Sequence, residues 1–359
     1  MAMTLMKGNE AIAEAAVRAG CRFFFGYPIT PQTEIPEYMS ARMPEVGGCY
    51  LQAESELAAI NMVYGASGTG VRVMTSSSSP GISLKQEGIS YLAASELPCV
   101  FVNIVRGGPG LGGIQASQGD YFQSTKGGGH GDYHTIVYAP ASVQECIDLM
   151  SRAFDRADKY RTPVLILADG IIGQMMEPVV LPEMVEYKPD RAEKPWAAMG
   201  YKPDSGYDRA VINSLYIELE EMDSLHQRLR KTYDAIEANE VLFEEYNMQD
   251  AELVVAAYGT VARICKGPID ELKYEGINVG LIRPITLWPF PKDAIRNAAA
   301  AERVKAVLTV ELSAGQLVED VRLAVNGAKP VEYFGYPGSK MPTPEEIKAK
   351  LIAMKGGAF

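Results

Sequence analysis

Short runs of consecutive apolar residues, separated by helical patterns, recur along the first half of the sequence. The clearest runs are Cys99–Val105 and Val164–Leu167, in which polar and apolar residues do not alternate. A strand of this kind is buried on both faces, which is typical of a parallel sheet covered by helices on both sides. The sequence therefore predicts an α/β fold built on a parallel sheet.

Strands and helices are expected to alternate from residue 1 to about residue 180. The predicted strands are 22–26, 48–52, 71–75, 99–105, 135–138 and 164–167. The predicted helices are 7–19, 55–66, 143–160 and one that runs from the Ser76–Pro80 turn to about Ser95. The same alternation resumes after residue 251, with strands predicted at 253–258, 278–282, 306–310 and 331–333, and indicates a second, smaller α/β domain.

The segment between these two regions has a different composition. Residues 183–208 are rich in Pro, Lys, Asp and Gly, which indicates an exposed linker. A charged helical pattern with one apolar stripe follows, formed by Leu215, Leu219, Met222, Leu225, Leu229, Tyr233 and Ile236. Such a stripe packs either on its own protein or on a partner. We therefore expect domains at 1–182 and 251–359, joined by a connector at 183–250.

Charge and cysteine content exclude several classes of function. The 45 acidic residues outnumber the 34 basic ones, and the net charge of −11 opposes binding to nucleic acid or to an anionic membrane. The apolar stretch 163–182 contains Asp169 and Glu177, which favours strand and loop over a membrane span. Five scattered cysteines form no Cys-x-x-Cys motif, so they suit reduced cytoplasmic thiols and provide no standard iron–sulfur motif.

Polar residues stand where three of the predicted strands end. Thr30 lies in the Tyr27–Pro31 turn, Glu54 and Glu56 begin a helix, and Arg106 follows the strand 99–105. Because the carboxyl ends of parallel strands meet at one edge of a sheet, these side chains can share a pocket. Each also has a simpler explanation: a rigid turn, first-turn acids favoured by the helix dipole, and a solvated surface arginine.

Three further patterns have features of ligand sites. The run Gly108–Gly113 satisfies G-x-G-x-x-G, but no helical pattern follows it, so a dinucleotide site is rejected in favour of a mobile loop over the pocket. The Ser76–Gly81 turn either binds an anion or caps a helix, and it is expected to line the pocket. His130 and His134 lie among glycines that disfavour a helix, so no metal site is predicted.

Together, the turn Tyr27–Pro31, the segment Gln52–Ile60 and the run Val105–Gly110 resemble the α subunit of 2-oxoacid:ferredoxin oxidoreductases, of the 3-methyl-2-oxobutanoate or 2-oxoglutarate type. The resemblance covers nearly the whole chain. It implies a thiamine diphosphate pyrimidine-binding domain at 1–182 and a transketolase C-terminal-like α/β domain at 251–359.

The resemblance also implies roles for single residues. Glu56, in the pattern Ser55-Glu56-x-x-Ala59, matches the catalytic glutamate that hydrogen-bonds N1′ of the cofactor's aminopyrimidine ring. Tyr27, Pro28 and Ile29 match cofactor-binding positions. Thr30 and Arg106 match substrate-binding positions, and the planar guanidinium suits a 2-oxo acid's carboxylate.

A Gly-Asp-Gly motif, which thiamine enzymes use to bind diphosphate and Mg²⁺, is missing from the sequence. Gly119-Asp120 and Gly131-Asp132 are each followed by tyrosine, and Ala168 precedes Asp169-Gly170. The resemblance therefore implies a β subunit that carries the diphosphate and Mg²⁺ site. It also implies γ and ferredoxin-like δ subunits with iron–sulfur clusters, ferredoxin as electron acceptor and coenzyme A as co-substrate.

The loop after Arg106 bears on the choice of substrate. Leu111 and Ile114 stand where the 2-oxoglutarate branch has a Ser-Thr-Gly-Leu-Pro-Thr segment, and they favour a branched-chain 2-oxo acid. The run from Lys126 to Tyr133 also resembles the branched-chain subfamily. Lys126 could pair a distal carboxylate, so 2-oxoglutarate stays open as the substrate. A nucleotide-binding dehydrogenase and a non-catalytic assembly subunit are the rival classes.

Overall fold

The computed structural model describes residues 3–338 and 340–357. Within these residues the first sheet has seven strands, in the order β12-β6-β7-β5-β4-β2-β3. They are β12 (Thr286–Trp288), β6 (Ile136–Tyr138), β7 (Pro163–Asp169), β5 (Cys99–Val105), β4 (Val73–Ser77), β2 (Phe23–Gly26) and β3 (Cys49–Gln52). Every pairing is parallel except that of β12 with β6. The predicted parallel α/β sheet is confirmed, with one antiparallel edge strand that comes from far along the chain.

Strand β5 shows why the apolar runs are continuous. Its side chains alternate between two separate apolar clusters: Val100, Val102 and Ile104 belong to one, and Cys99, Phe101 and Val105 to the other. Successive strand residues point to opposite faces, so a sheet covered on both sides needs apolar residues at nearly every position.

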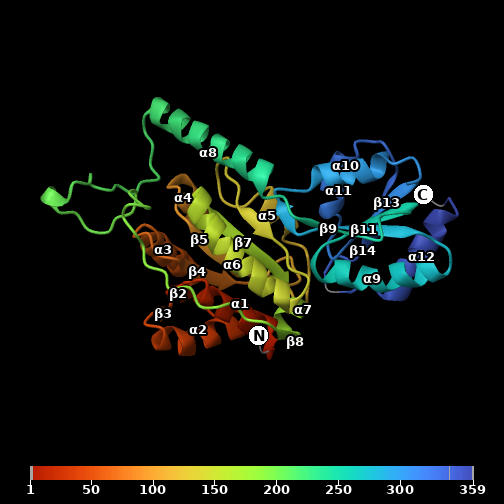
Figure 1. Ribbon diagram of the computed structural model, residues 1–359, viewed down its shortest axis with the longest axis horizontal. Helices are drawn as coiled ribbons and strands as arrows, with labels where there is room; N and C mark the ends of the chain where they lie inside the picture. The colour runs from red at the N-terminus through yellow and green to blue at the C-terminus, as the bar shows by residue number, and fades with distance from the viewer. Residues whose placement is uncertain (1–2, 339, 358–359) are drawn as a thin grey trace.

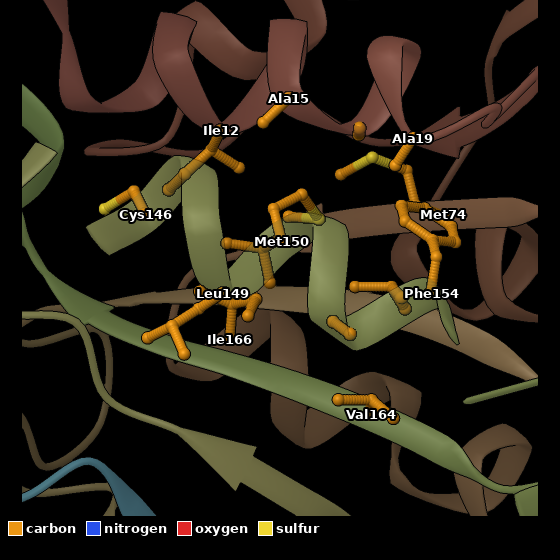
Figure 2. Close-up of a cluster of buried hydrophobic side chains, with 14 of the residues drawn as sticks. Ile12, Ala15, Ala19, Met74, Cys146, Leu149, Met150, Phe154, Val164 and Ile166 are labelled. Carbon is orange, nitrogen blue, oxygen red and sulfur yellow. The ribbon is translucent and has the colours of Figure 1, made fainter. Parts of the chain in front are cut away.

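Helices cover both faces of this sheet. The first face is covered by α1 (Gly8–Arg18), α2 (Glu34–Glu45) and α6 (Val143–Tyr160), and the second by α3 (Glu56–Ser67) and α4 (Pro80–Ala94). Figure 2 shows the first face, where Ile12 of α1, Met150 of α6 and Ile166 of β7 meet in one buried cluster. The carboxyl edge of the sheet is left to the strand-to-helix turns.

The second sheet has five strands within the described residues, in the order β14-β13-β10-β11-β9. They are β14 (Val331–Gly335), β13 (Ala306–Glu311), β10 (Leu253–Ala256), β11 (Val279–Pro284) and β9 (Phe243–Tyr246), of which β9 alone runs antiparallel to its neighbour. One face is covered by α9 (Gly259–Tyr274) and α12 (Pro344–Lys355), the other by α10 (Lys292–Ala300) and α11 (Leu317–Val325). The carboxylate of Glu311 accepts the backbone N–H groups of Gln316, Leu317 and Val318 at the start of α11.

Smaller elements complete the chain. Strands β1 (Thr4–Lys7) and β8 (Met176–Val179) form an antiparallel pair, and the short helices are α5 (Tyr121–Thr125), α7 (Gly170–Gln174) and a 3₁₀ turn at Pro203–Ser205. All five cysteines are free thiols, and four of them are buried. Among the described residues, no helix is both long and apolar enough to cross a bilayer.

The two sheets are joined by direct contacts. Apolar side chains from both, such as Leu165 of β7 and Ile282 of β11, belong to one buried cluster. Gln118 also exchanges hydrogen bonds with the backbone of Leu312, at 2.8 Å and 2.9 Å. The loop after β5 is therefore held against the C-terminal part of the chain.

The connector leaves the body and returns to it as a long helix. In Figure 1 the green segment before α8 (Leu219–Asn239) projects away from both sheets. The apolar stripe divides accordingly: Leu225, Leu229, Tyr233 and Ile236 are buried against the first sheet's helices, whereas Leu215 and Leu219 are exposed. The later half of the stripe thus packs on its own protein.

Glu240, directly after α8, anchors the connector. Its side chain is 1% exposed and accepts hydrogen bonds from Arg152, Arg156 and Tyr160 of α6, at 2.6–2.8 Å. Burial alone would raise the pKa of Glu240, but the hydrogen bonds from Arg156, Tyr160 and Arg152 outweigh it and hold the pKa below its ordinary value.

Replacing Glu240 by Gln should lower the free energy of unfolding by about 1.5 to 3 kcal/mol at pH 7, which is the range for hydrogen bonds to a charged group. The loss stays within this range because Arg152, Arg156 and Tyr160 keep part of their hydration. A carboxyl group whose pKa is lower in the folded protein than in the unfolded chain stabilises the fold at pH values above the unfolded pKa of about 4.3. This stabilisation is lost as the pH falls through the folded pKa. Urea unfolding at pH 7 and at about pH 3 should therefore show a smaller difference between the two proteins in acid. An equal difference at both pH values would contradict the ion-pair explanation.

Candidate active site

The turn after β2 meets Arg106 at the carboxyl edge of the first sheet. The Nη1 atom of Arg106 donates to the carbonyl of Thr30 at 2.9 Å, and Nη2 donates to the carbonyl of Leu111 at 2.9 Å. Arg106 therefore ties the turn to the glycine loop, and the ends of β2 and β5 bring together two positions that are 76 residues apart. Thr30 itself is exposed and contributes its backbone to this contact.

Arg106 is buried without a compensating charge. Arg106 is 7% exposed, and within the described part of the chain its Nε atom has no hydrogen-bond partner. Among the described residues it forms no ion pair, and both of its bonded partners are neutral carbonyls. A buried guanidinium in this state is costly unless an anion accompanies it. The arrangement suits a carboxylate ligand.

Glu56 is buried at the first turn of α3. Ser55 caps this helix by accepting the backbone N–H of Ala58 at 3.1 Å, which fixes the start of the helix directly before Glu56. Glu56 is 7% exposed, whereas Glu54 is exposed. The two glutamates therefore diverge, as their spacing predicts, and only Glu56 faces inward.

The start of α4 approaches Glu56 closely. A Cβ atom at Gly81 would stand 2.7 Å from Oε1 of Glu56 and would also collide with Oγ of Ser77. Glycine is thus required at position 81 if α3 and α4 are to pack at this distance. Glu56, Ser77 and the first turn of α4 form one side of the site.

Ser79 joins this side to Arg106. It has a φ of 26°, in the left-handed region that a non-glycine residue adopts only when its surroundings hold it there. Its N–H donates to Asn103 at 2.9 Å, its hydroxyl donates to Asp120 at 2.7 Å, and it accepts the N–H of Arg106 at 3.1 Å. Burial raises the pKa of Asp120, and the hydrogen bonds from Ser79 and Asn103 offset part of this rise.

Several buried polar atoms at this edge lack partners within the described part of the chain. They are the hydroxyls of Ser77 and Ser78 and the Nε of Arg106. Leaving a buried polar group unpaired costs about 1 to 3 kcal/mol, so this concentration marks a place where a polar ligand would bind. The residues present therefore fit a polar ligand with hydrogen-bonding atoms beside Ser77 and Ser78 and an anion beside Arg106.

The sequence interpretation missed residues that support the site. Gln32 is fully buried, donates to the carbonyl of Tyr27 at 3.3 Å and accepts a hydrogen bond from Ser76. Lys85 has no exposed surface and donates to Thr75 at 2.6 Å. Lys85 could have been found, because it stands in the apolar helical row of α4; Gln32 carries no comparable signal.

The other predicted positions have simpler surroundings. Tyr27 and Ile29 are half-buried and Pro28 is exposed; the carbonyl of Ile29 accepts the backbone N–H of Gln32. No helix begins directly after the glycine run, as the rejection of a dinucleotide site requires; the next helix is α5, with five residues. His134 stacks on Trp288, with ring centroids 4.5 Å apart.

The chain is similar to known proteins along nearly its whole length. Residues 14–244 match the family described as pyruvate flavodoxin/ferredoxin oxidoreductase, thiamine diphosphate-binding, and residues 251–347 match core domain II of pyruvate:ferredoxin oxidoreductase. The chain is 47% identical to the ketoisovalerate oxidoreductase subunit VorB of Methanothermobacter thermautotrophicus, over 99% of both chains. It is 39% identical to the 2-oxoglutarate synthase subunit KorA of Methanocaldococcus jannaschii, over 98% of this chain and 100% of that one.

A solved structure is also similar. It is the 2-oxoglutarate:ferredoxin oxidoreductase from Magnetococcus marinus with 2-oxoglutarate, coenzyme A and succinyl-CoA bound, with a TM-score of 0.87 and 26% sequence identity. The match covers 98% of this chain and 65% of that chain, so the present chain spans about two thirds of its length. The predicted resemblance and fold class are confirmed. The chain belongs to the 2-oxoacid:ferredoxin oxidoreductase family, among the subunits that carry its thiamine diphosphate-binding domain.

Proposed function

We propose that this chain is the α subunit of an enzyme that oxidatively decarboxylates a branched-chain 2-oxo acid to an acyl-coenzyme A and passes the electrons to ferredoxin. The observation that carries the proposal is the buried guanidinium of Arg106, which has no counter-ion among the described residues. Two charge-assisted hydrogen bonds from its planar fork would hold the carboxylate of a 2-oxo acid. Thr30, whose carbonyl accepts a hydrogen bond from Arg106, would be the second substrate-binding residue.

Glu56 is the side chain that the proposal assigns to the thiamine diphosphate cofactor. When bound, this cofactor supplies the nucleophilic carbon and the electron sink for decarboxylation. The Glu56 carboxylate would hold and exchange a proton at N1′ of the aminopyrimidine, with Tyr27, Pro28 and Ile29 beside it. Burial of Glu56 at a rigid helix start supports this role, because proton transfer depends on a fixed position.

Partner subunits would complete the site. Leu51 of the edge strand β3 is 40% exposed and Leu57, next to Glu56, is 47% exposed, which leaves apolar surface beside the site for another chain. A β subunit with a Gly-Asp-Gly motif would hold the diphosphate and Mg²⁺. Subunits of γ and ferredoxin-like δ type would carry the iron–sulfur clusters, in the cytoplasm.

The proposed division of the chain follows the same scheme. Residues 1–182 form the pyrimidine-binding domain, 183–250 the connector and 251–359 the C-terminal domain. The matched family regions, 14–244 and 251–347, support a boundary near residue 250. Strand β12 is an exception: residues 286–288 lie in the C-terminal part of the sequence, but they pair with β6 and extend the first sheet.

The branched-chain substrate is supported by Lys126 and by the glycine loop. Lys126 forms an ion pair with Asp320 of α11 at 2.7 Å, so its charge is already compensated. Leu111, held by Arg106, and Ile114 expose apolar side chains near the carboxylate site. The 2-oxoglutarate relatives keep 2-oxoglutarate as a second candidate substrate.

Replacing Glu56 by Gln should lower the turnover of the assembled complex by about 10²- to 10⁴-fold, because the amide cannot exchange a proton with N1′. Glu54→Gln is the matched control: it makes the same change two residues away on an exposed side chain and should leave turnover within about twofold. Steady-state assays at saturating substrate and cofactor measure both. A Glu56→Gln complex with undiminished turnover would favour a non-catalytic assembly subunit.

Replacing Arg106 by Ala should raise KM for every 2-oxo acid tested by about 10- to 100-fold, which corresponds to a loss of about 1.5 to 3 kcal/mol of charge-assisted binding. The matching methyl ketone, which lacks the carboxylate, should inhibit the wild-type and Arg106→Ala complexes equally well. An unchanged KM, or an equal loss of affinity for the ketone, would remove Arg106 from the carboxylate role.

The assembled enzyme should use 3-methyl-2-oxobutanoate with a kcat/KM at least about tenfold above that for 2-oxoglutarate, because a distal carboxylate would be desolvated without a partner. Lys126→Met should leave this preference unchanged, since Asp320 already pairs the lysine. If Lys126→Met selectively abolished activity with 2-oxoglutarate, the dicarboxylic assignment would replace the branched-chain one.

A further inference from the structure

One buried glutamine holds the first half of the turn between β2 and α2. Gln32 has no exposed surface, and its Nε2 atom donates to the carbonyl of Tyr27 at 3.3 Å. Its backbone N–H donates to the carbonyl of Ile29 at 3.1 Å. Two carbonyls of the Tyr27–Pro31 turn are therefore bonded to this one residue. They belong to positions that the proposed function assigns to the cofactor.

Ser76 connects Gln32 to the first sheet. The hydroxyl of Ser76, at the carboxyl end of β4, donates to Oε1 of Gln32 at 2.5 Å, and both side chains are fully buried. The backbone of this strand end is held as well, because the Ser76 carbonyl accepts a hydrogen bond from Nζ of Lys85 at 3.0 Å. The first half of the turn thus takes its position from β4.

The next residue of β4 lies against the Glu56 side of the site. Successive strand residues point to opposite faces, so Ser76 meets the segment before α2 on one face of the sheet and Ser77 meets α4 on the other. A Cβ atom at Gly81 would collide with Oγ of Ser77 and would stand 2.7 Å from Oε1 of Glu56. Two adjacent residues of one strand therefore contact the turn on one face and the surroundings of Glu56 on the other.

The second half of the turn has separate anchors. The carbonyl of Thr30 accepts a hydrogen bond from Arg106 at 2.9 Å, and the carbonyl of Pro31 accepts one from Nδ2 of Asn9 at 2.8 Å. Loss of the bond to β4 would therefore free the first half of the turn and leave the second half, with Arg106, in place.

We propose that Gln32 is a positioning residue, whose bond to Ser76 sets the separation between the turn Tyr27–Ile29 and Glu56. This inference rests on the proposed function, which assigns the turn and Glu56 to the same cofactor. Gln32 touches neither substrate nor cofactor in this account. It acts through the carbonyl of Tyr27 and the end of β4.

Two substitutions remove the bond from opposite sides: Ser76→Ala and Gln32→Leu. In the assembled complex each should lower kcat by about 10- to 100-fold at saturating substrate and cofactor, because a small displacement of a reacting group slows the reaction steeply. KM for the 2-oxo acid should change by less than about threefold, because Arg106 keeps its contact with the turn. The double variant should lose no more than Gln32→Leu alone, because both changes break the same bond.

Ser67→Ala is the matched control for Ser76→Ala. Ser67 is also fully buried, and its hydroxyl donates to the carbonyl of Pro98 at 2.6 Å, at the amino end of β5. Both substitutions should lower Tm by a similar amount, because each leaves one buried hydrogen-bond partner unpaired. Ser67→Ala should nevertheless keep kcat and KM within about twofold of wild type, because it lies away from the site. Equal kinetics in the two serine variants would mean that the bond to Gln32 is structural only.

A measurement without cofactor separates this inference from the proposed function. Hydrogen–deuterium exchange of the assembled complex, without added thiamine diphosphate, should be at least about tenfold faster in the peptide that covers residues 26–33 for Ser76→Ala and unchanged there for Ser67→Ala. Ser76→Ala carries this test even if Gln32→Leu does not fold.

Unchanged exchange or an unchanged kcat in Ser76→Ala would overturn the proposal. If the turn exchanges faster as expected while Glu56→Gln keeps full turnover, the proposed catalytic function fails and the anchoring of the turn by Gln32 stands.

Discussion

The strained first turn of α4 is the constraint that the whole site depends on. Ser79 is held with a φ of 26° by hydrogen bonds to Asn103, Asp120 and the backbone of Arg106. Two residues later, Gly81 has no side chain, so the start of α4 can lie directly against Glu56. One turn therefore fixes the distance between an acidic side chain on α3 and a cation at the end of β5. If this turn relaxed, the two halves of the site would separate.

The C-terminal part of the chain serves this arrangement from outside. Gln118 bonds the backbone of Leu312, and Asp320 of α11 accepts a hydrogen bond from Tyr121 and forms an ion pair with Lys126. The segment that follows the glycine loop is thus held at its far end by the second sheet, while Arg106 holds Leu111 within the loop. In this account the second sheet supplies no catalytic group. It sets the position of the loop that we propose faces the substrate's side chain.

The sequence predicted the features that local pattern determines. Continuous apolar runs such as 99–105 became buried parallel strands, and their ends brought Glu56, Thr30 and Arg106 to one edge. Helix α2 was missed because Pro36 and Pro44 lie within it, and β12 was missed because its partner β6 is about 150 residues distant in sequence, a separation that no periodicity reveals. Gln32 and Asp120 were missed for the same reason, since their roles depend on contacts with distant strands. Lys85 could have been predicted, because it shares one helical row with Ile82, Ile89 and Leu92, where an apolar residue is expected.

The most direct test of the central claim is a structure of the assembled complex with thiamine diphosphate and a non-reactive 2-oxo acid analogue. The account predicts that the Glu56 carboxylate lies within hydrogen-bond distance of N1′ of the aminopyrimidine ring, and that Arg106 meets the analogue's carboxylate. A structure that places the ring away from α3, or the analogue away from the end of β5, would contradict it.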